Sequence, residues 1–94
     1  MNVEKFECED KYEAEKLAAF LALQKDNGTF LQGVASIIQN EVVIILKDKS
    51  SHSVTMKDRC TAMRLKLLIE DVLVQKKRIS GSNFEHCVTE ITIH

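Results

Sequence analysis

The stretch EVVIILK, residues 41–47, decides the fold class of this chain. Four of its five central residues are β-branched, which favours a β-strand in the interior of a sheet. Successive side chains of a strand point to opposite faces, so the even-numbered residues point one way and Val43 and Ile45 the other. Both faces of this strand are therefore apolar, and each needs a cover.

The segments before this strand predict a strand and then a helix. Residues Val3 to Glu9 alternate between apolar and charged side chains, which is typical of a strand. Asp10 followed by Glu13 forms a capping-box-like pair that predicts the start of a helix over Lys11 to Lys25. Asn27-Gly28 predicts its end, because both residues tolerate the left-handed conformation. A second strand, with a candidate bulge at its glycine, is expected over Phe30–Ile38.

The segments after the central strand predict a turn, a helix and a final strand. A turn is expected at residues 48–51, and a short return strand at Val54–Met56 competes with a lead into the next helix. The apolar periodicity predicts a long helix over Lys57 to Lys77. Ser80 to Asn83 reads as a break, and Phe84 to Ile93 as the last strand.

The predicted order is β-α-β-β-(β)-α-β within a single domain, residues 1–94, with no internal repeat. Two helices and four or five strands pack most simply as a two-layer α+β sandwich, with both helices on one face of an antiparallel sheet. The ferredoxin-like plan is the leading candidate for this order.

Composition indicates a globular protein of a reducing compartment. The chain has 45% hydrophobic and 29% charged residues and a net charge of -1, which excludes a disordered class. Its three cysteines are widely spaced, which favours neither a disulfide framework nor a zinc site. With neither an apolar leader segment nor a stretch long enough to span a membrane, the chain is expected to be cytoplasmic.

No motif in the sequence points to catalysis. His86 and Cys87 are adjacent, but neighbours on a predicted strand point to opposite faces and cannot act on one substrate. The three glycines are isolated, so no phosphate-binding loop is present. We therefore expect no enzyme activity, no cofactor, no metal and no small-molecule substrate.

The two-sided apolar strand predicts an interaction surface. Leaving four to six such side chains in water forgoes roughly 1.5–3 kcal/mol each relative to burial. A symmetric homodimer is the commonest way to cover such a face, with docking of another protein as a variant and cover by the chain's own segments as the alternative. A small protein-interaction or regulatory module is expected, and the residues predicted at its interface are Ala35, Ile37, Val43 and Ile45.

A nucleic-acid-associated domain is the alternative function. The entry from residues 6–9 into Glu13-Ala14-Glu15, and the later helix entry at Asp58-Arg59, resemble in part small dimeric subunits of a tRNA-modifying assembly. The last strand and Arg59-Cys60-Thr61 depart from that pattern. The resemblance implies a subunit of an RNA-modifying assembly. In that case phosphate would contact the basic residues of the second predicted α-helix and of its C-terminal end, which are Arg59, Arg64, Lys66, Lys76, Lys77 and Arg78.

Overall fold

The computed structural model describes residues 2–27 and 31–94, and the side chains of residues 24–27, 31, 34 and 35 lie outside this description. It contains two helices and antiparallel strands, so the predicted α+β class is confirmed. The elements are β1 (Asn2–Glu7), α1 (Lys11–Asn27), β2 (Leu31–Ile38), β3 (Glu41–Leu46), β4 (Ser51–Thr55), α2 (Arg59–Gln75), β5 (Ile79–Gly81), a 3-10 turn η1 (Glu85–Cys87) and β6 (Val88–Ile93).

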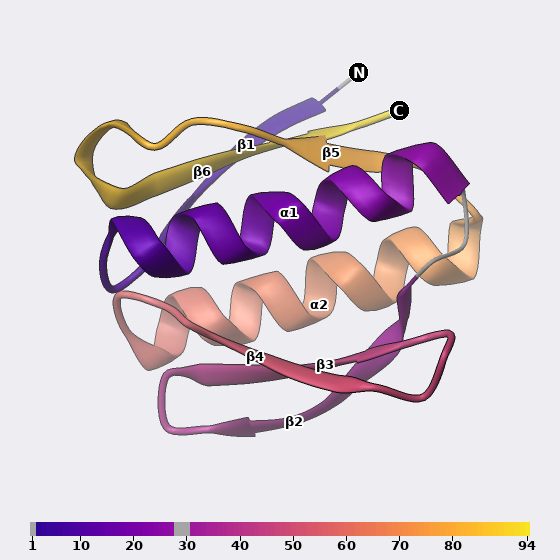
Figure 1. Ribbon diagram of the computed structural model, residues 1–94, viewed down its shortest axis with the longest axis horizontal. Helices are drawn as coiled ribbons and strands as arrows, with labels where there is room; N and C mark the ends of the chain where they lie inside the picture. Colours follow the sequence, from indigo (N-terminus) through magenta and orange to yellow (C-terminus); the bar gives the residue numbers. More distant parts are fainter. Residues whose placement is uncertain (1, 28–30) are drawn as a thin grey trace.

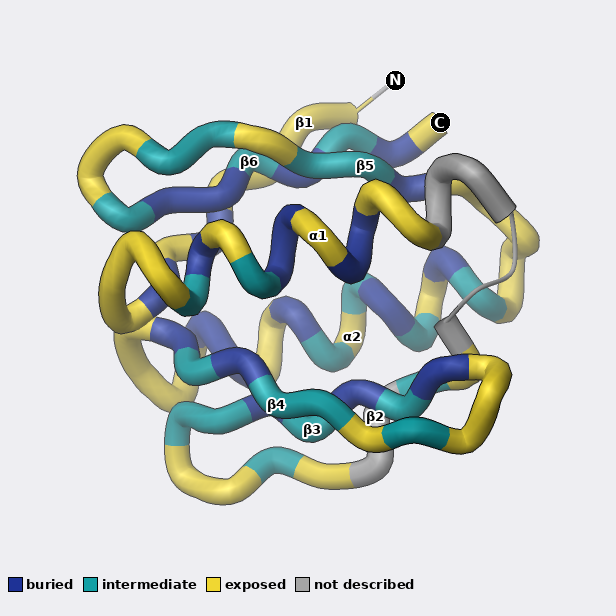
Figure 2. The backbone as a smooth tube through the Cα atoms, in the orientation of Figure 1, coloured by how far each residue is buried: buried dark blue, intermediate teal, exposed yellow. Residues whose placement is uncertain are grey.

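The described strands form two sheets rather than the single sheet expected. One sheet has the order β1-β6-β5 and the other β2-β3-β4, and they lie on opposite sides of the two helices (Figure 1). The ferredoxin-like plan is not confirmed. The sheets meet at one point, where Cys8 pairs with Met56. The faces that the sheets and helices turn toward one another are buried (Figure 2), and they form one apolar core.

The two halves of the chain repeat the same β-α-β-β unit. Adding 48 to the residue numbers of α1 gives those of α2, and both helices are 17 residues long. Adding 47 to the residue numbers of β3 gives those of β6. The bonds beside the Cys8–Met56 bridge are reciprocal: Glu9 donates to the carbonyl of Thr55 at 3.0 Å and Lys57 to that of Glu7 at 2.9 Å. The bridge therefore lies on an approximate two-fold axis.

The expectation of no internal repeat is wrong, and the reason is visible in the sequence. Identical residues at the shift of 48 are sparse, as at Asp10 and Asp58 or Leu17 and Leu65. The repeat preserves the apolar periodicity and the helix caps rather than the residue identities. These two features are enough to form the same helices in both halves. Each half contributes its first strand to the sheet of the other half, since β1 pairs with β6 and β4 with β3.

The last predicted strand is shorter than expected. His86 and Cys87 adopt positive φ angles of 58° and 60° in η1, so the strand begins only at Val88. Two successive left-handed residues cannot continue a strand. The predicted break at Ser80–Asn83 conceals the short strand β5, which pairs with β6. The predicted return strand is confirmed as β4, although its register begins earlier, at Ser51.

Both helices begin at an aspartate cap. Asp10 Oδ1 accepts the N–H of Glu13 at 2.9 Å, and Asp58 Oδ1 accepts the N–H of Thr61 at 2.7 Å. The bonds from Thr61 hold the pKa of the Asp58 carboxyl below its usual value. The cap is therefore formed by the ionised carboxylate and is weakened by protonation.

We expect the Asp58 cap to make the protein sensitive to acid. A depressed folded-state pKa contributes stability that is present above the unfolded value of 3.8 and lost as the pH falls through the folded value. Asp58→Asn should keep the cap and lose this part of the acid sensitivity, whereas Asp58→Ala should be less stable at both pH 7 and pH 3. Urea denaturation at the two pH values checks this. Equal acid sensitivity of the wild type and Asp58→Asn would contradict it.

Candidate functional site

The outer face of the β2-β3-β4 sheet is the surface that the sequence analysis singled out. Val42, Ile44 and Leu46 are buried against the helices, so the odd-numbered residues of β3 face outward. Val43 pairs with Ser53, and Ile45 with Ser51. Both apolar residues are half-buried, as expected for the middle strand of a sheet flanked by two neighbours. No described helix or strand covers this face (Figure 1).

The strand β2 contributes different residues to this face from those predicted. Ile37 pairs with Val42 and packs against the core, so its expected outward position is wrong. Ser36 pairs with Val43 instead, and Ile38, which is 61% exposed, pairs with Glu41. The two-residue turn at residues 39 and 40 causes this, because it pairs residues 36–38 with 43–41 in continuous register and so places Ile37 on the inward side with Val42. The side chain of Ala35 lies outside the described residues.

The outward row of β3 has opposite charges at its two ends. It begins at Glu41, continues through Val43 and Ile45, and ends at the exposed Lys47, which follows the strand. The neighbouring positions on β4 are the small hydroxyl residues Ser51, Ser53 and Thr55. The face thus has an apolar centre, a hydroxyl border, an acidic end and a basic end. We call these residues, together with Ser36 and Ile38, the outer β3 face.

The equivalent face of the other sheet is polar along β6, although Val3 of β1, which pairs with Thr92, is 59% exposed there. The shift of 47 places Glu90 where the first half has Val43, and Thr92 where it has Ile45. Glu90 lies opposite Lys5 and forms an ion pair with it at 3.8 Å. The fold therefore accepts polar side chains at these positions, and the apolar residues of the outer β3 face are not required by the backbone.

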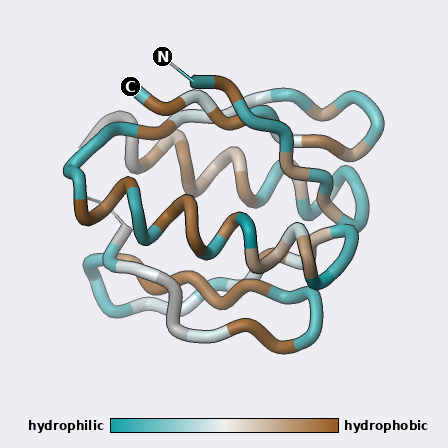
Figure 3. The backbone as a smooth tube through the Cα atoms, turned by 180° about the vertical axis from the view of Figure 1, so that it is seen from behind, coloured by the Kyte–Doolittle hydropathy of each residue, from teal (hydrophilic) through white to brown (hydrophobic). Residues whose placement is uncertain are grey.

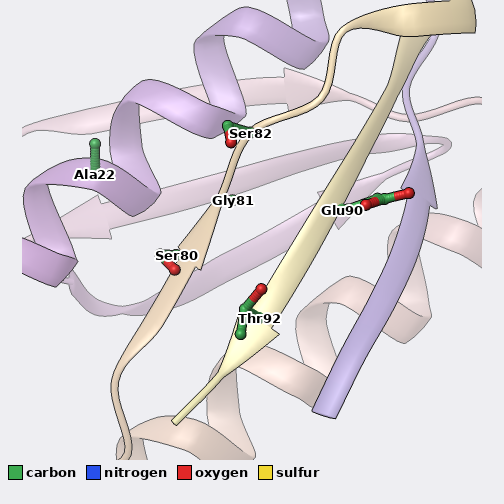
Figure 4. Close-up of a pocket in the computed structure, with 6 residues that line it drawn as sticks. All are labelled: Ala22, Ser80, Gly81, Ser82, Glu90 and Thr92. Carbon is green, nitrogen blue, oxygen red and sulfur yellow. The ribbon is translucent and has the colours of Figure 1, made fainter. Parts of the chain in front are cut away.

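The polar sheet has a hollow of about 290 Å³ along β5 and β6. Figure 4 shows that the Glu90 side chain points toward β1, away from Ser80 and Ser82, in agreement with its ion pair to Lys5. The remaining polar groups are three hydroxyls on an open surface. Such an arrangement offers no convergent set of ligands. The lining residues are Ala22, Ser80, Gly81, Ser82, Glu90 and Thr92.

The residues predicted for nucleic-acid contact are spread along α2 and beyond it. Arg59 opens the helix, whereas Lys76 caps its far end and Lys77 and Arg78 follow, a separation of roughly 25 Å along the axis. Lys66 is paired with Glu70 at 3.0 Å. The guanidinium of Arg64 lies 4.9 Å from the centre of the Phe6 ring. The structure thus does not gather these six residues into one patch, and phosphate binding stays a prediction.

The cysteines lie in three different environments. Cys8 is 4% exposed and belongs to the core, Cys87 is half-buried, and Cys60 is exposed. Burial raises the pKa of the Cys8 thiol to about 11. The described residues contain no group of three potential metal ligands. Cys8 is therefore a packed apolar group rather than a nucleophile, because the thiolate is the reactive form.

A hydrogen-bonded set that sequence reasoning missed lies at the turn between β3 and β4. The Ser50 hydroxyl donates to Asp48 Oδ1, and His52 Nε2 lies 3.0 Å from the Ser50 oxygen. The two bonds from Ser50 hold the pKa of Asp48 below its usual value. Since the serine proton points to the carboxylate, the histidine is not placed to remove it. This set closes the hairpin as an Asx turn.

No protein-family model, curated protein or solved structure matches this chain. Neither helix, over the residues that are described, is long and apolar enough to cross a membrane. The function must therefore be argued from the geometry of the chain's own surfaces.

Proposed function

We propose that this protein is a non-enzymatic interaction module that forms a homodimer through the outer β3 face. The observation that carries the proposal is the contrast between the two sheets. At equivalent positions the first half turns the half-buried Val43 and Ile45 outward, while the second half has the half-buried Glu90 and Thr92. A cytoplasmic location accompanies the proposal and rests on the free cysteines.

A second copy of the chain suits this face because its charges are self-complementary. A two-fold axis perpendicular to β3 and passing between Val43 and Ile45 places Glu41 of one copy near Lys47 of the other. The apolar residues then meet at the centre, and the serines lie at the border. The same patch on both subunits is the hallmark of an isologous interface, and opposite charges at its ends fix the register.

The size of the face supports a weak dimer rather than an obligate one. Three strands and five residues cover about 14 by 17 Å. Interfaces with so small a contact lie at the transient end of the observed range. A dissociation constant in the micromolar range or above is therefore expected, and a reversible association fits a regulatory module.

Ile45→Glu should raise the dissociation constant of the dimer more than tenfold while the monomer remains folded. The substitution places a carboxylate at the centre of the apolar contact in both copies, where each charge loses water without gaining a partner. Sedimentation equilibrium over protein concentrations from micromolar to millimolar measures the change, and circular dichroism checks the fold.

The matched control is Thr92→Glu, which makes the same kind of change at the equivalent position of the polar sheet. It should leave the dimer unchanged. The proposal fails if the wild type stays monomeric over the whole concentration range, or if both substitutions weaken association equally.

A further inference from the structure

A second surface feature lies between β1 and α2. Here the structure has a hollow of about 290 Å³ lined by Glu4, Arg64, Leu67 and Leu68. Leu67 is 61% exposed, and Leu68 is partly buried against the core. In the rear view of Figure 3, β1 and α2 both lie toward the viewer and converge at the end where β1 leaves its sheet. This hollow is on a different side of the molecule from the outer β3 face.

The equivalent place in the first half of the chain is filled. The shift of 48 carries Glu4 onto His52 and Leu68 onto Phe20. There the imidazole of His52 packs on the ring of Phe20, with the ring centres 5.0 Å apart. In the second half the acidic Glu4 stands at the position of the imidazole, and no ring pair at this position occurs among the described residues.

Beside the His52–Phe20 contact of the first half lies a carboxylate that has no counterpart beside the hollow of the second half. Glu13 Oε2 accepts the backbone N–H of Thr55 at 3.3 Å, beside the free edge of β4. In the second half, Thr61 stands at the position of Glu13, and the N–H of Glu7 stands at the position of the Thr55 N–H. Threonine has no carboxylate, and no corresponding bond to the N–H of Glu7 occurs among the described residues. The open place thus lacks both an apolar ring and an acidic acceptor.

The edge of β1 beside the hollow has backbone groups available for pairing. The N–H of Cys8 donates to Cys87 on the β6 side, whereas the carbonyl of Glu7 accepts Lys57 on the opposite side. Backbone groups alternate in direction along a strand, so those of Val3 and Lys5 also point away from β6. β1 is an edge strand of its sheet, and an unpaired edge is a template for another strand.

We propose that β1 and the hollow bind an extended acidic peptide segment of a partner protein by strand addition. The peptide pairs with the backbone of Val3 and Lys5, an aromatic side chain covers Leu67 and Leu68, and a carboxylate lies near Arg64. None of the ion pairs in the described part of the chain includes Arg64, which lines the hollow together with Glu4 and whose guanidinium lies 4.9 Å from the centre of the Phe6 ring. Main-chain pairing with pockets for alternate side chains is an established recognition mode.

A second copy of β1 is a poorer occupant than an acidic peptide. The two antiparallel registers that pair the most of this strand are centred on Glu4 or on Lys5. Each places like charges directly opposite one another, which destabilises a strand pair. An aromatic and acidic segment supplies the two groups that His52 and Glu13 supply in the first half.

The test is a nuclear magnetic resonance titration with a defined peptide. The probe is Ser-Asp-Thr-Phe-Thr-Asp-Ser with blocked ends, which places the phenylalanine and both carboxylates on one face when extended. The protein is the Ile45→Glu variant, so that self-association through the outer β3 face does not contribute. Binding should shift the amide signals of Val3 and Lys5 and slow their hydrogen exchange at least tenfold.

Two substitutions make the result specific. Leu67→Glu should weaken peptide binding at least tenfold, since it places a charge beside the aromatic side chain. Ala19→Glu, at the equivalent position of α1, should leave binding unchanged. A peptide with lysine in place of aspartate should bind at least tenfold more weakly.

Four outcomes would overturn the proposal. They are an absence of shifts at millimolar peptide, protection confined to other strands, equal binding of the lysine peptide, and protection of Val3 and Lys5 that rises with protein concentration alone. The last outcome would identify a second copy as the occupant. None of them bears on the dimer proposal, which the Thr92→Glu and Ile45→Glu comparison tests separately.

Discussion

Gly81→Ala is expected to lower the free energy of unfolding by about 1–3 kcal/mol, the cost of overpacking a close-packed site. A Cβ at Gly81 would lie 2.8 Å from the carbonyl oxygen of Glu90 and 2.9 Å from Cδ1 of Leu21. The first neighbour is the backbone of β6, which cannot move without disturbing the sheet. The short strand β5 therefore sits between α1 and β6 only because this residue has no side chain. Urea denaturation measures the loss.

Gly33→Ala is the matched control, because the shift of 48 makes Gly33 the counterpart of Gly81. A Cβ at Gly33 meets nothing within 4 Å. Its replacement should leave stability unchanged or raise it slightly, since alanine restricts the unfolded chain. Equal losses at the two positions would show that the close approach of β5 to α1 and β6 is not the cause.

Raising the pH from 9 to 11 is expected to lower the free energy of unfolding of the wild type by about 2 kcal/mol through Cys8 alone. Burial raises the pKa of this thiol from 9.0 to about 11. The unfolded chain therefore loses the Cys8 proton before the folded chain does. The contribution is fully present below pH 9 and is lost as the pH rises through the folded value, at about 1.4 kcal/mol per unit. Urea denaturation across this range measures the slope.

Cys8→Ala should be less stable than the wild type at pH 7, because it leaves a small cavity, but its stability should fall less between pH 9 and pH 11. Cys60→Ala, which removes an exposed thiol, controls for the general effect of losing a cysteine. Parallel pH profiles for the wild type and Cys8→Ala would show that the buried thiol does not carry the expected alkaline sensitivity.

The approximate two-fold symmetry provides an internal comparison that stands in for related sequences. Both halves have the same β-α-β-β order, so a polar residue in one half shows that the equivalent apolar residue in the other is not required by that order. At the outer β3 face, Val43 of the first half corresponds to Glu90 of the second. At the hollow beside β1, Glu4 and Leu68 correspond to His52 and Phe20, whose rings pack together in the first half.

The candidate site was predictable where it depends on alternation within one strand. Val43 and Ile45 face outward as the sequence of β3 implies. Ile37 does not, because the two-residue turn at residues 39 and 40 pairs it with the inward-facing Val42, and residue types alone did not fix the exact position of that turn. The hollow beside β1 combines Glu4 with residues some sixty positions later, so no local pattern could indicate it.

The sequence by itself determined the positions of both helices, their aspartate caps and the inward side of β3, because these depend on neighbours within a few residues. Only the tertiary structure decided which strands share a sheet. Phe6 pairs with Thr89, and nothing near either residue specifies the other. Any edge strand offers the same backbone groups, so the choice of partner follows from how the helices and both sheets pack together.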